Sequence, residues 1–378
     1  MSKKITYIFG YGRVPKILSN EIYAQEFFYS YSIFNNENYD LDVIEMGHLE
    51  DIKSLSFRFL LLIDRVLVKI SRLPFYTRHI MSFNNIKRLA KTDVLISTNH
   101  RMGLSIFPIY VLSSLYKKTN FIVISMGLIA EMKLNRFVTF YRKVFLKVFL
   151  SFVDKIVFLG DGEYQLAKKQ YPKFSHKFIF LPFCVDYDFW SEDNNSFPIK
   201  KEGILFVGND GKRDYLKLID IAKVLQDFSF TFVTDNELIL ESNEIPNNVK
   251  IINGSWHDEL LTDQELRRIY TEAKITILPL KESYQPSGQS VTLQSICAGT
   301  PVLISDTKGF WDKAKFVNNE NIIYVNNNSV GGWVDEITKI YNNEELLKNI
   351  SYKGSKLIKE HFKLEIFDKN LLDLVNKK

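Results

Sequence analysis

The residues best suited to chemistry lie in a loop, residues 281–306, that follows the strand-like segment KITILPL. Pro286 stiffens the approach to a short run of serine, glycine and glutamine, and the helix-like segment VTLQSICA comes next. N–H groups at the start of a helix lack partners within it, and they favour an anion such as phosphate by about 0.3–1 kcal/mol. A helix that is simply capped uses the same residue types, so both interpretations stay open on this loop alone. The candidate anion-binding residues are Ser287, Gly288, Gln289 and Ser290.

A second loop, VGNDGKRDY over residues 207–215, combines backbone freedom with positive charge. Gly208 can take conformations closed to other residues, and Lys212 and Arg213 follow it. Arginine can hold a diphosphate through two parallel hydrogen bonds. An exposed turn has the same composition, but two such loops after strands in one half of the chain together favour an anion site.

The third loop is Gly10–Arg13, with Gly10, Tyr11, Gly12 and Arg13 as candidates for the acceptor side of a reaction. It does not match the dinucleotide pattern G-x-G-x-x-G, because glycine would be needed where Pro15 stands, and the chain holds no G-x-x-x-x-G-K-[ST]. His100 directly follows the strand-like DVLIST, where a side chain can face a cleft; an isolated histidine is also commonly structural.

Metal-binding and nucleophile motifs are poor. The D-x-D pairs, Asp40 with Asp42 and Asp186 with Asp188, fit structural roles at a strand start and in a linker. No G-x-S-x-G elbow is found. The histidines show no metal-ligand spacing; they are His48, His79, His100, His176, His257 and His361.

The elements that must position these loops alternate between strand and helix along the whole chain. This alternation predicts an α/β protein with two doubly wound parallel sheets, covered by helices on both faces. A polar segment, residues 184–203, is the linker candidate, and the pattern restarts at Gly203. Thr262 and Glu265 predict a capping box. The predicted strands are 4–10, 93–98, 120–125, 154–160, 177–183, 203–208, 230–234, 249–254, 274–280 and 300–305, and the C-terminal helices are 331–349 and 351–372.

Composition and charge fit a globular protein of about two domains, with 46% hydrophobic and 25% charged residues and two cysteines in 378. Residues 1–150 carry 21 Lys and Arg against 11 Asp and Glu, which leaves 28 against 33 for the rest. No apolar run is long enough to span a bilayer. Two basic, apolar segments, 52–80 and 134–156, fit either a helix lying on an anionic membrane or one packed on a sheet. The second interpretation is favoured for 134–156, and both stay open for 52–80.

The segment PSGQSVTLQSICAGTPVLISD resembles the signature of GT-B glycosyltransferases of family 4. Segments within 152–190, 203–222 and 263–283 resemble that family in the same order, whereas residues 1–150 match only in architecture. The resemblance implies two Rossmann-like domains facing across a cleft. We expect an N-terminal acceptor domain at 1–195, a C-terminal nucleotide-sugar domain at 196–360, and a C-terminal helix at 361–378 that packs back toward the N-terminal domain.

The resemblance also implies roles for residues. The run 287–290 would lie on the donor diphosphate, with Gly208 and Lys212 nearby and Arg213 as the matching cation. Gln294 would contact the ribose, although the family has glutamate there. The family's first glutamate falls on Pro286, so Glu282 is the candidate substitute. The usual histidine falls near residues 125–127, which leaves His100 as the histidine candidate. The predicted catalytic residues are therefore Arg213, His100 and Glu282.

The predicted function is transfer of a hexosyl-type sugar from a nucleoside-diphosphate sugar to a hydroxyl acceptor, with retained configuration, no cofactor and no metal. The charge asymmetry, together with what the family resemblance implies, favours a glycan or lipid-linked glycan acceptor in bacterial surface polysaccharide or lipopolysaccharide synthesis. The protein would be cytoplasmic, with contact to an anionic membrane through 52–80 left open, and no nucleic acid is expected. The alternatives are a noncatalytic GT-B subunit that supports a partner enzyme and, less favoured, a sugar-nucleotide epimerase.

Overall fold

The computed structural model describes residues 2–19, 21–37, 39–47, 55–130, 134–191, 201–254 and 260–377. Residues 192–200 of the predicted linker lie outside the described residues, as do His48, His257 and the first residues of the 52–80 segment.

The chain divides into two compact units. The first consists of Met1–Glu21, Phe28–Leu181 and Asp368–Lys378, and the second of Ile22–Phe27 and Pro182–Phe367. The division after Leu181 lies earlier than the predicted one after residue 195, because strand β6 ends at Phe180 and the chain from Pro182 packs with the second unit. Nothing in the sequence predicts that the short segment Ile22–Phe27 belongs to the second unit. The last residues count with the first unit, where the Lys3 Nζ donates to the Val375 carbonyl at 2.7 Å.

The first unit is built on a six-stranded sheet in the order β2-β1-β3-β4-β5-β6, with every neighbouring pair parallel. Its central strands are continuous apolar runs; all four residues of β3 are buried, as expected for a parallel sheet covered on both faces. The strands are β1 Lys4–Phe9, β2 Asp40–Glu45, β3 Val94–Ser97, β4 Asn120–Ser125, β5 Lys155–Phe158 and β6 Phe178–Phe180. The helices are α1 Arg13–Leu18, α2 Tyr31–Asn36, α3 Leu55–Ser71, α4 Phe83–Leu89, α5 His100–Ser114, α6 Arg136–Phe152 and α7 Asp161–Gln170. The C-terminal α15, Leu364–Asn376, belongs to this unit from Asp368 onward.

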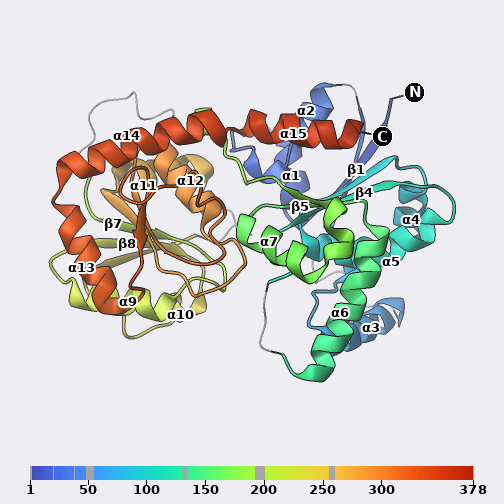
Figure 1. Ribbon diagram of the computed structural model, residues 1–378, viewed down its shortest axis with the longest axis horizontal. Coiled ribbons are helices and arrows are strands. Elements are labelled where there is room, and N and C mark those ends of the chain that lie inside the picture. Colours follow the sequence, from blue (N-terminus) through green and yellow to red (C-terminus); the bar gives the residue numbers. More distant parts are fainter. Residues whose placement is uncertain are drawn as a thin grey trace. The chain divides into compact units, whose positions relative to one another are not determined.

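The second unit repeats the design with the order β12-β11-β10-β7-β8-β9, again parallel throughout. Figure 1 shows α11 and α12 on one face of this sheet and α9 and α13 on the other. Its strands are β7 Ile204–Val207, β8 Phe230–Thr234, β9 Val249–Asn253, β10 Ile275–Leu278, β11 Val302–Ser305 and β12 Ile323–Val325. Its helices are α8 Tyr187–Ser191, α9 Tyr215–Val224, α10 Glu237–Leu240, α11 Asp263–Glu272, α12 Gln289–Cys297, α13 Val330–Tyr341 and α14 Glu344–His361.

Helix boundaries follow capping chemistry. The predicted capping box is confirmed: the Glu265 N–H donates to Thr262 Oγ, and the Thr262 N–H donates to Glu265 Oε2 at 2.8 Å. The two predicted C-terminal helices, 331–349 and 351–372, are wrong in their bounds. Asn343 caps a new helix by accepting the Leu346 N–H at 3.0 Å, so α14 begins at Glu344, and a second break separates it from α15.

Both sheets reverse their strand order at one point, and loops after the strands there are the usual place for ligands. In the second sheet this switch point lies between β7 and β10, which precede the loops with Arg213 and Ser287. In the first sheet it lies between β1 and β3, which precede Gly10–Arg13 and His100. The predicted doubly wound parallel architecture of two units is confirmed, and it brings the candidate loops of each unit together in pairs.

Candidate functional site

The strongest candidate site lies at the switch point of the second sheet, where backbone hydrogen bonds join the loop after β7 to the loop after β10. The Asp214 N–H donates to the Pro279 carbonyl, and the Lys281 N–H donates to the Lys212 carbonyl, both at 2.9 Å. Between these bonds Arg213 forms an antiparallel bridge with Leu280. This short ladder fixes the backbone of Arg213 against the start of the loop that leads to α12.

The Arg213 guanidinium is buried at the centre of this site, with 3% of the residue exposed. Its Nη1 donates to Ser287 Oγ at 3.0 Å, and Ser287 Oγ donates to Asp210 Oδ2 at 2.7 Å. The Arg213 Nη1 also lies 3.5 Å from Asp210 Oδ2. Its Nε is buried and has no hydrogen-bond partner among the described residues, which leaves one strong donor available in a place where such donors are ordinarily satisfied.

Two glycines make room for this guanidinium. A side chain at Gly208 would overlap Arg213 Nε, and a Cβ at Gly288 would lie 3.4 Å from Arg213 Nη1 and 3.2 Å from Ile304 Cδ1. Gly288 has φ of +82° and caps α12 without a side-chain hydrogen bond. The absence of side chains at both positions lets the arginine lie against the start of α12.

Asp210 keeps the site near neutral charge in this structure. Burial would raise the pKa of its carboxyl, but the positive charge of Arg213 and the hydrogen bond from Ser287 outweigh burial, and the pKa lies below its usual value. The carboxylate also accepts the Lys212 N–H at 2.8 Å. Asp210 was not singled out from the sequence, although it lies inside the loop that was.

The structure thus brings together most of the predicted donor-binding residues. Gly208, Ser287 and Gly288 lie against Arg213, and the Lys212 N–H donates to Asp210 beside them. Gln289 and Ser290 form the first turn of α12. Glu282 lies on the same loop but is exposed, and its Oε1 accepts the Lys308 N–H at 3.0 Å. A catalytic role for Glu282 stays a prediction.

Gln294 lies further along α12 and is engaged by the protein itself. Its Nε2 donates to Glu26 Oε1 at 2.8 Å, and its Oε1 accepts from the Tyr270 hydroxyl at 3.3 Å. Trp190 Nε1 donates to the same Glu26 oxygen at 2.9 Å. The predicted ribose contact of Gln294 stays a prediction, and it requires the amide to exchange one of these partners.

Glu26 is a carboxylate that sequence reasoning missed, since nothing in YAQEFFYS marks it as functional. It comes from the segment Ile22–Phe27, is 1% exposed, and its Oε2 also accepts the Asp186 N–H at 3.4 Å. Burial raises its pKa to about 7, opposed in part by the hydrogen bond from Gln294, and nearby Asp263 and Asp186 raise it further.

This pKa predicts a pH-dependent stability. Because the folded-state pKa lies above the ordinary glutamate value of about 4.5, the folded protein holds a proton that the unfolded chain releases. Stability should therefore fall as the pH rises from about 4.5 through about 7, by up to about 3 kcal/mol. Urea unfolding at pH 5 and at pH 8 measures the loss in the free energy of unfolding between the two. Glu26→Gln should make this loss smaller than in wild type, whereas the exposed control Glu241→Gln should leave it unchanged. If wild type and Glu26→Gln lose the same unfolding free energy between pH 5 and pH 8, the raised pKa of Glu26 is contradicted.

In the first unit His100 begins α5 directly after β3, as predicted for a residue at a strand end. Burial, with smaller contributions from the charges of Arg101 and Arg142, lowers the pKa of its imidazole to about 3. Its Nδ1 is buried without a hydrogen-bond partner among the described residues. A neutral imidazole of this kind suits hydrogen bonding to a ligand better than accepting a proton.

The loop at Gly10–Arg13 leads into a helix start that is bound by a carboxylate of the protein. Gly12 takes φ of +86° and α1 begins at Arg13, but the N–H groups of Arg13 and Val14 donate to Glu45 Oε1 at 2.6 and 2.8 Å. A carboxylate of the protein therefore already occupies the start of this helix. The acceptor role of this loop stays a prediction.

A second carboxylate that the sequence did not reveal is Glu163 of α7, which binds the loop after β4. Glu163 is fully buried and accepts Ser125 Oγ at 3.0 Å, the Gly127 N–H at 2.7 Å and the Ile129 N–H at 2.9 Å. Burial raises its pKa, and these donors oppose the rise. Glu163 holds the backbone of the loop in which the family resemblance expects a histidine.

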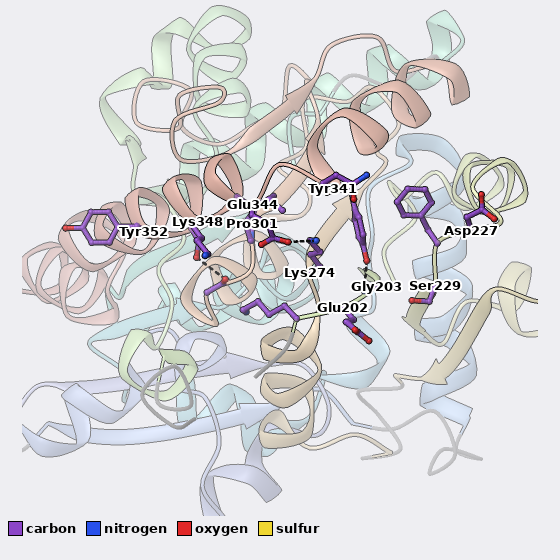
Figure 2. A pocket seen from close by; sticks show the side chains of 16 residues that line it. Glu202, Gly203, Asp227, Ser229, Lys274, Pro301, Tyr341, Glu344, Lys348 and Tyr352 are labelled. Carbon is purple, nitrogen blue, oxygen red and sulfur yellow. Dashed lines mark hydrogen bonds and ion pairs between the residues drawn. The ribbon is translucent and has the colours of Figure 1, made fainter. Parts of the chain in front are cut away.

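A cavity of about 910 Å³ lies elsewhere in the second unit. Gly203, Ser229, Lys274 and Pro301 line it, each just before β7, β8, β10 or β11, so it lies at the amino ends of these strands. Figure 2 shows the Lys274 ammonium turned to Glu344, an ion pair of 2.6 Å, and Tyr341 turned to Gly203. Because all strands are parallel, the Arg213 site is at the opposite edge of the sheet, and this cavity is not part of it.

Among the residues the structure describes, no group of three or more His, Cys, Asp or Glu side chains is placed to hold a metal ion. Metal independence remains a prediction about the reaction. Within the same residues, none of the helices has both the length and the apolar character needed to cross a bilayer.

No protein-family model and no curated protein sequence matches the chain. Solved structures do. A glycosyltransferase from Rickettsia africae ESF-5 matches with a TM-score of 0.65 and 13% identity, over 99% of this chain and 98% of that one. HepE of Anabaena, crystallised with UDP and glucose, matches with a TM-score of 0.65 and 9% identity over 99% of both chains. Sucrose-phosphate synthase from Thermosynechococcus elongatus matches with a TM-score of 0.66 and 12% identity over 98% of both chains.

At sequence identities this low, the structural likeness shows the fold alone. This chain has two parallel six-stranded sheets with flanking helices, each a Rossmann-like unit, and its likeness to these three structures extends over almost the full length of every chain. The chain has the GT-B fold that these glycosyltransferase structures share.

Proposed function

We propose that this protein is a glycosyltransferase that moves a sugar from a nucleoside-diphosphate sugar to a hydroxyl acceptor. The observation that carries the proposal is the buried Arg213 guanidinium beside the glycine-capped start of α12, at the switch point of the second sheet. Its Nε has no hydrogen-bond partner among the residues that the structure describes. A guanidinium and helix N–H groups together are suited to a diphosphate. The resemblance of residues 281–306 to family 4 supports the same assignment.

The donor's diphosphate would lie on Ser287, Gly288, Gln289 and Ser290, with Arg213 and Lys212 as its cations. HepE was crystallised with UDP, which supports a uridine nucleotide as the first donor to test here. In this structure the Ser287 hydroxyl donates to Asp210. We expect it to rotate toward a bound phosphate, because the diphosphate would compete with Asp210 for the same two donors.

Arg213 would act where negative charge develops. Cleavage of the sugar–phosphate bond leaves that charge on the diphosphate, and a preorganised donor aimed at it lowers the barrier by about 3–4 kcal/mol. Because Arg213 is already fixed by the ladder to Leu280, no reorganisation is needed at that moment. We further propose retention of configuration and no metal, with the cationic side chains in the place a metal ion would otherwise fill.

The acceptor would be held by the first unit, at the switch point formed by Gly10–Arg13 and His100. The excess of positive charge in residues 1–150 supports an anionic or lipid-linked glycan as acceptor. We propose a hexosyl transfer in bacterial surface polysaccharide or lipopolysaccharide synthesis, by a cytoplasmic enzyme that works at the inner face of the membrane.

A noncatalytic GT-B subunit is the second candidate, and specific residues favour it. Pro286 and Gln294 stand where the family has carboxylates, and the amide of Gln294 is satisfied inside the protein. Such a subunit would bind the nucleotide through Arg213 without turnover.

Nucleotide binding and donor hydrolysis separate these possibilities. We expect UDP to raise the melting temperature by several degrees at 100 times its Kd, which corresponds to about 2.7 kcal/mol of stabilisation. UMP should have a much smaller effect, because the proposed site holds the diphosphate. Release of UDP from UDP-sugars would then identify an enzyme, and its absence with binding intact would favour the noncatalytic subunit. Equal effects of UMP and UDP would contradict the diphosphate site.

A further inference from the structure

Two neighbouring helices of the first unit, α3 and α6, have large apolar side chains facing solvent. Figure 1 shows the two helices beside each other, and Arg142 of α6 donates from Nη1 to the Arg72 carbonyl just after α3 at 3.0 Å. Nine apolar side chains on them are between 37% and 64% exposed: Phe59, Leu62, Ile63 and Val66 on α3, and Phe137, Phe140, Val144, Val148 and Phe152 on α6. We call these residues the α3/α6 face.

Packing onto the sheet does not account for this face. The core side of α6 is supplied by other residues, Val138, Leu146, Phe149 and Leu150, which are buried. The exposed set recurs at intervals of three and four residues, as on one side of a helix. The interpretation favoured for 134–156, an amphipathic helix packed on a sheet, therefore explains only the inner side of α6.

Positive charge is interleaved with these apolar side chains. Six exposed cations lie on the two helices: Arg58, Arg65 and Lys69 on α3, and Arg136, Lys143 and Lys147 on α6. The single acidic residue in either helix is Asp64, which is buried and paired with Arg78 at 3.1 Å. The exposed sides of both helices are thus apolar and basic without any opposing carboxylate.

We propose that the α3/α6 face binds the surface of an anionic bilayer, with the apolar side chains in the headgroup boundary and the cations on lipid phosphates. Helices that lie on membranes combine these two residue types. The long lysine and arginine side chains can reach outward while their neighbours enter the apolar layer. The centre of a protein–protein interface, in contrast, is depleted in lysine, which disfavours a second protein as the occupant. The proposal does not depend on the donor site.

Vesicle flotation with the full chain tests whether the α3/α6 face binds an anionic bilayer. Wild type should bind vesicles of phosphatidylcholine with phosphatidylglycerol, bind phosphatidylcholine alone at least tenfold more weakly, and lose affinity as salt rises. Phe137→Ser with Phe140→Ser should lower the affinity at least tenfold. Lys143→Gln with Lys147→Gln should lower it roughly fivefold for each charge removed.

Matched controls keep the outcome specific. Leu112→Ser with Leu115→Ser removes two other exposed apolar side chains of the first unit, and Lys168→Gln with Lys169→Gln removes two other exposed cations. Both should bind as wild type, and the melting temperature should show every variant folded. No wild-type binding, or equal losses in test and control variants, would overturn the proposal. So would a wild-type dimer that the α6 variants dissociate without any vesicle binding. Because the UDP-induced shift is measured on the same samples, failure here leaves the donor proposal separately testable.

Discussion

Arg213→Ala is expected to lower kcat by about 10²–10³, the usual loss when one preorganised donor to a developing charge is removed. The free energy of unfolding should change little, because the Asp210 side chain that loses its partner is 40% exposed and can be hydrated. Arg213→Lys keeps the charge but loses the planar fork that holds Ser287, so it should give an intermediate loss. Steady-state release of UDP and thermal unfolding of the same preparations provide the two measurements.

The matched control is Arg268→Ala, which removes an arginine of the same unit that is 78% exposed and paired with Glu272. Turnover by this variant should stay within a factor of two of wild type, roughly what is expected of a surface change. If Arg213→Ala turns over at a rate near that of the control, the diphosphate does not lie on this guanidinium, and the proposed mechanism fails.

Gly208→Ala is expected to lower turnover by about 10–100-fold without changing any charge in the site. The added methyl group would overlap Arg213 Nε, so the guanidinium must move away from the start of α12. Displacement of a catalytic group by about 1 Å can cost about 100-fold in rate. A UDP titration by calorimetry should show the same displacement as weaker binding.

Gly211→Ala is the control for this change, because it lies three residues further along the same loop and a Cβ there would meet nothing within 4 Å. It should leave turnover and UDP affinity close to wild type. Equal losses in Gly208→Ala and Gly211→Ala would show that the loop needs general flexibility, and the specific placement of Arg213 would then not be the cause.

Much of the architecture could be predicted from local patterns. Short apolar runs such as ITIL and VLIS mark buried strands, because a parallel sheet covered on both faces needs no polar alternation. The regular alternation of these strands with helices predicts two doubly wound sheets. The breaks in the C-terminal helices were missed, because asparagine at 343 reads as an ordinary helix residue until its side chain is seen to cap a new start.

The two loops that we propose as the donor site could be singled out because their residue types lie in contiguous segments. Ser287 and Gly288 precede a helix, and Arg213 follows a glycine after a strand, so residue type and order were sufficient. Glu26 and Glu163 were not predictable in this way. Each accepts hydrogen bonds from partners far away in the sequence, Gln294 and Ser125 respectively.

The order of residues along the chain was therefore enough to predict the α/β class and the two parallel sheets, and to single out the two loops that meet at Arg213, because these follow from short-range spacing. Folding alone decided that Arg213 is buried with Ser287 between two glycines, that a glutamate from Ile22–Phe27 satisfies Gln294, and that α3 and α6 leave an apolar, basic face in solvent. Each of these depends on which distant segments pack together and on which side of a helix finds a partner.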